Sequence, residues 1–123
     1  MDKVRVATLQ YLIRPIRTVD EFRDQVRGLV HTAAEYDCSM VVFPEYFVIQ
    51  LLCLGKVDGS MYDQIRWLAD HTPAVVEDMR GLAREFGIHI VAGSMPVRDK
   101  TTPDKLYNES TFFFPDGTSG SQP

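Results

Sequence analysis

The chain has 123 residues, 45% of them hydrophobic, and a formal net charge of −4 at pH 7. This apolar fraction suits a packed domain and excludes a wholly disordered chain. The acidic balance argues against nucleic acid as the main partner, because a surface that follows phosphates needs an excess of basic residues.

The amino-terminal stretch MDKVRVATLQY carries charges within its apolar positions and has no continuous apolar segment of the kind found in signal peptides. The longest apolar run, FVIQLLCL, is interrupted by Gln50 and is too short to cross a bilayer. The only cysteines, Cys38 and Cys53, make no case for a disulfide scaffold. We therefore expect a reduced, cytoplasmic protein with no membrane partner.

The first half of the chain predicts a strand, a helix and a second strand. β-Branched residues spaced by two predict a strand over 3–11. An apolar stripe of helical period predicts a helix over 18–37, and Thr18 and Glu21 have the spacing of a capping box at its start. The stretch CSMVVF, residues 38–43, predicts a short apolar strand, the pattern expected when both faces of a sheet are covered.

Two helices are predicted next, over 60–71 and 72–87. Thr72 is the expected cap of the second helix, Pro73 suits its first turn, and Gly87 suits its end. Pro73 therefore marks the predicted boundary between the two helices.

The last third of the chain predicts strands over 88–93 and 106–114, and a tight turn at PDG, residues 115–117. The stretch AGSMP is interpreted as a strand end that turns into a loop, and residues 118–123 as a flexible tail. Alternation of strands and helices predicts an α/β fold, with a mostly parallel sheet and flanking helices, in a single domain over 1–123.

Glu45 is the principal candidate for a functional residue. It lies in MVVFPEYF, directly beyond an apolar strand, and functional residues in α/β sheets collect beyond the carboxyl ends of the strands. The neighbouring Phe43, Pro44, Tyr46 and Phe47 would partly desolvate the carboxylate, raise its pKa and make it a better general base. The alternative is a structural carboxylate at a helix start, where Pro-Glu is common.

The other polar candidates give weaker signals. Cys38 is interpreted as a small core residue, and Cys53 as part of the core or a pocket wall, because no base lies beside it. The three histidines, His31, His71 and His89, lack metal-ligand spacing. His31 is expected to be solvated, and His89 is expected to be a hydrogen-bonded structural residue. No Gly-rich nucleotide motif is present, so neither a cofactor nor a metal is expected, and a flavodoxin-like fold ranks last.

Four motifs in order, VRVATLQY, VVFPEYF, IHIVAGSMPV and LYNESTFFFPDGT, resemble the amino-terminal part of the nitrilase superfamily, the carbon–nitrogen hydrolases. The similarity covers nearly the whole chain and is greatest to the amidase-like branches. It implies part of an αββα sandwich, a small-molecule amide or nitrile substrate and a homo-oligomer. It also implies a Glu-Lys-Cys thiol mechanism in which Glu45 is the family's first glutamate, with no cofactor.

The resemblance leaves two family residues without a match. The family's lysine follows the strand after PDGT, where this chain ends in SGSQP, and its nucleophilic cysteine comes later still. Lys100 and Lys105 precede the matching strand, and both cysteines precede it too. We therefore expect an amino-terminal fragment or truncated homologue that is inactive alone and exposes apolar surface, or alternatively a non-catalytic binding or assembly module.

Overall fold

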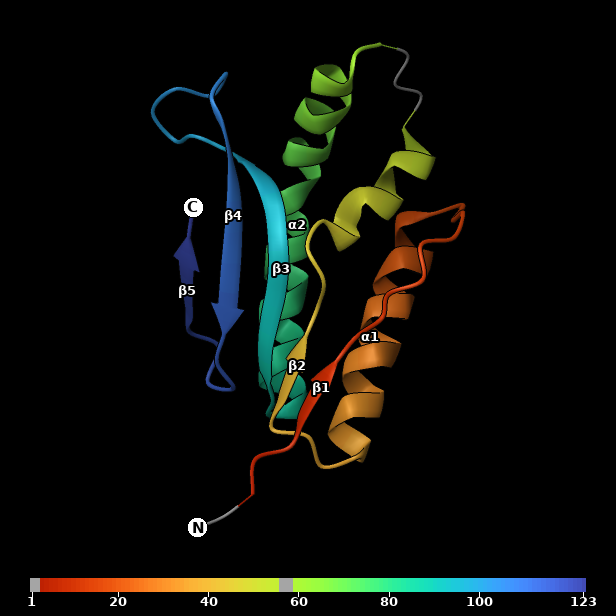
Figure 1. The fold of residues 1–123 in the computed structure, drawn as a ribbon, viewed down its shortest axis with the longest axis vertical. Helices are drawn as coiled ribbons and strands as arrows, with labels where there is room; N and C mark the ends of the chain where they lie inside the picture. The colour runs from red at the N-terminus through yellow and green to blue at the C-terminus, as the bar shows by residue number, and fades with distance from the viewer. Residues whose placement is uncertain (1–2, 56–58) are drawn as a thin grey trace.

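A single five-stranded sheet, in the order β1-β2-β3-β4-β5, organises the described part of the chain (Figure 1). The structure is a computed structural model and describes residues 3–55 and 59–123. Its elements are β1 (Val6–Thr8), α1 (Val19–Glu35), β2 (Met40–Val42), the 3-10 helix η1 (Phe47–Leu54), α2 (Met61–Phe86), β3 (His89–Arg98), β4 (Leu106–Phe113) and β5 (Ser119–Gln122). The predicted α/β class is confirmed.

The sheet is mixed: its first half is parallel, as expected, and its second half is antiparallel. β1 pairs with β2 and β2 with β3 in parallel, whereas β3 pairs with β4 and β4 with β5 antiparallel. The cause is the length of the connections. Parallel neighbours need a crossover of a dozen or more residues, which α1 and α2 provide, whereas the links 99–105 and 114–118 permit only hairpins.

The predicted start of α1 is confirmed. The Thr18 side-chain oxygen accepts a hydrogen bond from the backbone N–H of Glu21 at 3.1 Å. This bond satisfies one of the amides that a helix start leaves free.

The two helices predicted between 60 and 87 are one continuous helix, α2, with Pro73 inside it. Thr72 is buried rather than a cap, and its hydroxyl donates to the carbonyl of Pro96 on β3 at 2.8 Å. Proline removes one intrahelical bond, but apolar side chains on both sides of it, Leu68 and Val75, pack into the same core. Gly87, in the left-handed conformation at φ 61°, ends the helix as predicted.

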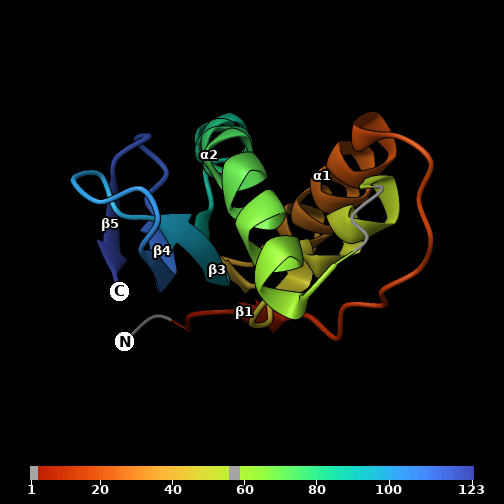
Figure 2. The same cartoon turned by 90° about the horizontal axis from the view of Figure 1, so that it is seen from above.

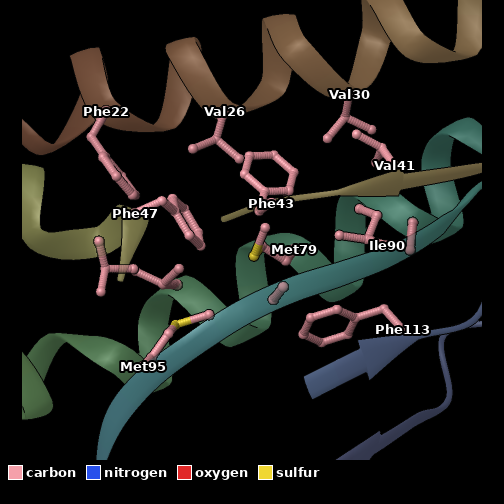
Figure 3. Close-up of a cluster of buried hydrophobic side chains, with 14 of the residues drawn as sticks. Phe22, Val26, Val30, Val41, Phe43, Phe47, Met79, Ile90, Met95 and Phe113 are labelled. Atoms are coloured by element: carbon pink, nitrogen blue, oxygen red, sulfur yellow. The ribbon is translucent and has the colours of Figure 1, made fainter. Parts of the chain in front are cut away.

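Both long helices cover the same face of the sheet (Figure 2). Between helices and sheet lies a core in which Val30, Val41, Met79, Ile90 and Phe113 are fully buried (Figure 3). Burying such a side chain contributes about 1.5–3 kcal/mol to stability. This shared core holds both helices against one face of the sheet.

The other face of the sheet has no covering element among the described residues. Strand residues alternate between faces, so the neighbours of the buried core positions point to this side. Val6 on β1 is 47% exposed, and Phe114, just beyond β4, is 41% exposed. The flanking helices therefore cover one face only, contrary to the two-sided burial predicted from CSMVVF. We call this side the uncovered face.

The end of the chain contains a strand that the sequence analysis missed. Residues 118–123, expected as a flexible tail, include β5, which pairs with β4 from Ser110↔Gln122 to Phe113↔Ser119. The predicted PDG turn lies between these strands, where Asp116 accepts hydrogen bonds from Thr118. Within residues 3–55 and 59–123 no helix combines the length and hydrophobicity needed to cross a bilayer.

Candidate functional site

The segment that carries Glu45 is a turn held against β3. Phe43 donates its backbone N–H to the carbonyl of Val91 at 2.9 Å, and Tyr46 donates to the carbonyl of Ser94, also at 2.9 Å. Tyr46 has a left-handed backbone with φ 55°, which turns the chain out of the sheet. Glu45 therefore sits between two anchored residues at the carboxyl end of β2.

A β-bulge in β3 makes room for this turn. The pairing of β3 with β4 shifts between Ala92 and Met95, so the strand does not end at AGSMP as expected but continues to Arg98. A Cβ atom on Gly93 would lie 1.9 Å from the carbonyl oxygen of Pro44. Bulges are often found beside active sites, where they redirect a side chain. Only glycine allows the backbone of the Glu45 turn to approach β3 so closely.

The carboxylate of Glu45 contacts a side chain from a distant strand. Asn108 Nδ2 donates to Glu45 Oε1 at 3.1 Å, a contact between residues 63 apart in sequence. On β4, Thr111 and Phe113 are buried toward the helices, so Asn108, which alternates with them, faces the opposite side. The Glu45 carboxylate therefore lies at the uncovered face of the sheet.

The prediction that the neighbouring residues desolvate the Glu45 carboxylate is wrong, because the Glu45 side chain is exposed in the described part of the structure. The flanking aromatics point into the core instead: Phe43 is 2% and Phe47 1% exposed, and their ring centroids are 4.8 Å apart. Tyr46 is the aromatic neighbour whose pKa the Glu45 carboxylate affects. Burial and, second, the charge of Glu45 raise the pKa of Tyr46.

Glu45 does not line two of the grooves on the described surface. One of about 420 Å³ lies between α1 and α2 and is bordered by the ion pairs Arg23–Asp78 and Arg27–Glu85. Another, of about 320 Å³, lies on the uncovered face over Phe112 and β5. Glu45 lines neither of them.

Neither cysteine is brought to Glu45. Cys38 packs against the edge of the core and precedes β2, at the opposite end of the strand from Glu45. Cys53 is exposed, which corrects its assignment to the core or a pocket wall. The helix η1 turns other residues, Phe47 and Leu51 among them, toward the core and leaves Cys53 on its outer side.

The histidines have structural partners. His31 is exposed and lies 3.1 Å from the Glu35 carboxylate, while His89 Nδ1 lies 3.2 Å from the carbonyl of Ser39. His71 Nδ1 lies 2.9 Å from the carbonyl of Trp67. In the part of the chain that the structure describes, no three histidine, cysteine or acidic side chains converge in a group able to hold a metal ion.

Comparison with known proteins identifies the family. The sequence model described as "Carbon-nitrogen hydrolase" matches residues 5–122. The chain belongs to the carbon–nitrogen hydrolase family. Among curated relatives, it is 30% identical over 119 residues to omega-amidase NIT2 of Xenopus tropicalis, covering 96% of this chain and 38% of that protein. It is 29% identical to the probable hydrolase YhcX of Bacillus subtilis, covering 97% of this chain and 22% of that protein.

Solved structures of the nitrilase superfamily share the fold. Saccharomyces cerevisiae Nit3, a member of branch 10 of the superfamily, matches with a TM-score of 0.70 at 24% identity, over 97% of this chain and 43% of that one. An amidase from Nesterenkonia sp. matches with a TM-score of 0.67 at 23% identity, over 96% of this chain and 41% of the amidase chain. The chain thus spans less than half the length of these relatives.

Two residues of the site were not singled out from the sequence. Gly93 stands at the end of the predicted strand 88–93, although an isolated glycine within a strand pattern is a signal for a bulge or a close backbone approach. Asn108 entered only as part of a family motif. Its contact with Glu45 depends on the register of the hairpin between β3 and β4, which sequence spacing does not reveal.

Proposed function

We propose that Glu45 is the first catalytic carboxylate of an amidase-like thiol hydrolase that acts on non-peptide carbon–nitrogen bonds. The family acts on amide or nitrile substrates. The observation that carries the proposal is the position of Glu45, which the anchored turn holds at the carboxyl end of a parallel strand. In α/β sheets this end is where functional side chains gather.

In the proposed reaction Glu45 moves protons in both halves of the cycle. Its carboxylate takes the proton of a cysteine thiol, and the thiolate attacks the amide carbon to form a carbon–sulfur bond. The resulting oxyanion needs a lysine or amide donors nearby. When the carbon–nitrogen bond breaks, the Glu45 carboxylic acid gives its proton to the departing amine. Glu45 then takes a proton from water as the water attacks the thioester. The carbon–sulfur bond breaks, the carboxylic acid product leaves, and Glu45 returns the proton to the cysteine sulfur, which restores the thiol.

The exposure of Glu45 is compatible with this role. Its carboxylate lies on the uncovered face, where the described residues leave apolar strand positions facing outward. In the sandwich that the family resemblance implies, a second sheet would pack on this face and exclude water from the carboxylate. A dry site strengthens the electrostatic interactions that a general base uses. The same packing would bring the thiol and the cation to the Glu45 turn.

The names of relatives suggest an amide substrate. The relatives include omega-amidases, and one solved structure of the Nesterenkonia amidase is a double mutant, with a glutamate replaced by glutamine and a cysteine by alanine, in complex with acrylamide. Another is a cysteine mutant in complex with butyramide. We therefore propose a short terminal amide as the substrate class. The resemblance also predicts a homo-oligomer, which sedimentation of the natural polypeptide tests.

A non-catalytic binding or assembly module is the second candidate, and one observation favours it. Neither described cysteine lies with Glu45: Cys38 is at the opposite end of β2, and Cys53 forms no hydrogen bond with Glu45 among residues 3–55 and 59–123. A base without a thiol has nothing to activate. This candidate predicts a folded protein that does not hydrolyse amides.

Ammonia release from butyramide by the natural polypeptide that contains these residues separates the two candidates. Turnover, together with an acyl adduct on a cysteine in the intact mass spectrum, is the expected result. A folded polypeptide that releases no ammonia from butyramide or from a panel of short amides and nitriles would favour the non-catalytic module. A Glu45→Gln variant of the same polypeptide is the negative control, because glutamine cannot take the proton of a thiol.

A further inference from the structure

We infer that Asn108 is a positioning residue for Glu45, which it holds in the orientation needed to accept a proton. This inference rests on the proposed function, because it assigns a partner to the proposed base. Its foundation is the contact between Asn108 Nδ2 and Glu45 Oε1 at 3.1 Å.

The direction of this hydrogen bond follows from its chemistry. An ionised carboxylate only accepts hydrogen bonds, so the amide nitrogen of Asn108 must face it. The bond engages one carboxylate oxygen. Among the described residues no hydrogen bond or ion pair engages the other, Glu45 Oε2. Asn108 thus restrains the carboxylate and leaves one oxygen for a reacting group.

The two partners are held by different parts of the fold. The Glu45 backbone is fixed by the hydrogen bond from Tyr46 to Ser94 and by its close approach to Gly93. Asn108 lies within β4, opposite Pro96 on β3. The preceding residue, Tyr107, donates its hydroxyl to Asp99 in the turn that joins these strands, at 3.0 Å. With both backbones fixed, the Asn108 contact determines the remaining freedom of the Glu45 side chain.

A restraint of this kind affects the chemical step rather than binding. Misplacement of a catalytic group by about 1 Å can cost on the order of 10²-fold in rate. Loss of the Asn108 contact leaves the Glu45 carboxylate in place but free to rotate. We therefore expect kcat to fall while KM for a small amide changes little. A residue with only a structural role would change the melting temperature and not produce this separation.

The test compares Asn108→Leu and Asn108→Asp in the natural polypeptide, with butyramide as the probe and ammonia release as the readout. Leucine is similar in size to asparagine but carries no hydrogen-bond donor. Aspartate has the same shape as asparagine but cannot donate a hydrogen bond when ionised. We expect kcat to fall roughly 10- to 100-fold in both variants, with KM within about twofold. Ser110→Ala is the matched control, because Ser110 is on the same face of β4 and donates to Ala92 instead.

Glu45→Gln, measured in parallel, separates this inference from the proposed function. If Glu45→Gln is inactive while both folded Asn108 variants keep a kcat within twofold of the unsubstituted polypeptide, the positioning role is overturned and the base stands. If Asn108→Leu fails to fold, Asn108→Asp alone decides. Full activity of Glu45→Gln, or no hydrolysis by the unsubstituted polypeptide, would overturn both proposals.

Discussion

Replacing Gly93 by alanine should displace the turn that carries Glu45. The added Cβ would lie 1.9 Å from the Pro44 carbonyl oxygen and 2.8 Å from the Glu45 backbone nitrogen. Real Cβ atoms essentially never approach other atoms below 3.0 Å, so the backbone must separate by at least 3.0 − 1.9 = 1.1 Å. A shift of this size also weakens the 2.9 Å hydrogen bond from Tyr46 to Ser94.

The expected cost of Gly93→Ala combines two effects. Overpacking of a tight contact costs about 1–3 kcal/mol. A lost or weakened backbone hydrogen bond adds about 0.5–1.5 kcal/mol. We therefore expect the free energy of unfolding of the natural polypeptide to fall by roughly 2–4 kcal/mol, since the obstructing atoms belong to the backbone rather than to a flexible side chain.

Urea unfolding, followed by circular dichroism, measures this change against a matched control. Gly28 lies within α1, and a Cβ there meets no atom within 4 Å, so Gly28→Ala should be neutral or stabilise by about 0.5–1 kcal/mol. A Gly93→Ala variant within about 0.5 kcal/mol of the unsubstituted protein, with the same dependence on urea, would refute the close approach as described.

Three further predictions concern the rest of the fold. Gln50, fully buried, donates to the carbonyl of Arg14, and Gln50→Leu should lower the free energy of unfolding by about 1–3 kcal/mol in urea titrations, whereas an unchanged value would mean that water satisfies the carbonyl. The backbone N–H of Thr101 holds the pKa of Asp99 below its ordinary 3.8, so this carboxylate stabilises the fold above that pH, and the stabilisation is lost as the pH falls through the folded-state pKa. Asp99→Asn should therefore reduce the loss of melting temperature on acidification, and a pH profile identical to that of the unsubstituted protein would contradict this. A polypeptide of residues 1–123 should self-associate through its uncovered face, and Phe112→Thr should reduce the association; a monomer at high concentration in sedimentation would count against both expectations.

Elements that depend on local patterns were predictable from the sequence. Thr18 with Glu21 located the start of α1, and Gly87 located the end of α2, because both signals act within one turn of the chain. The prediction of a helix boundary at Pro73 is wrong because tertiary packing overrides the local preference of proline for a helix start. The core contacts on both sides of it make one long helix more favourable than two short ones.

The site was only partly predictable for a physical reason. The position of Glu45 after an apolar strand was visible in the sequence, but its exposure was not, because the adjacent aromatics Phe43 and Phe47 pack into the core. The contact with Asn108 depends on the β3–β4 register, which includes a bulge. A bulge changes which residues face each other, and no periodic pattern records that change.

The kcat of Glu45→Gln in the natural polypeptide, with butyramide as the substrate, tests the central claim most directly. Glutamine keeps the size of the side chain and the hydrogen-bonding capacity toward Asn108, since its amide oxygen also accepts. It cannot take a proton from a thiol, so we expect kcat to fall by about 10²–10⁴-fold with an unchanged melting temperature. A folded Glu45→Gln variant whose kcat stays within twofold of the unsubstituted polypeptide would contradict the account.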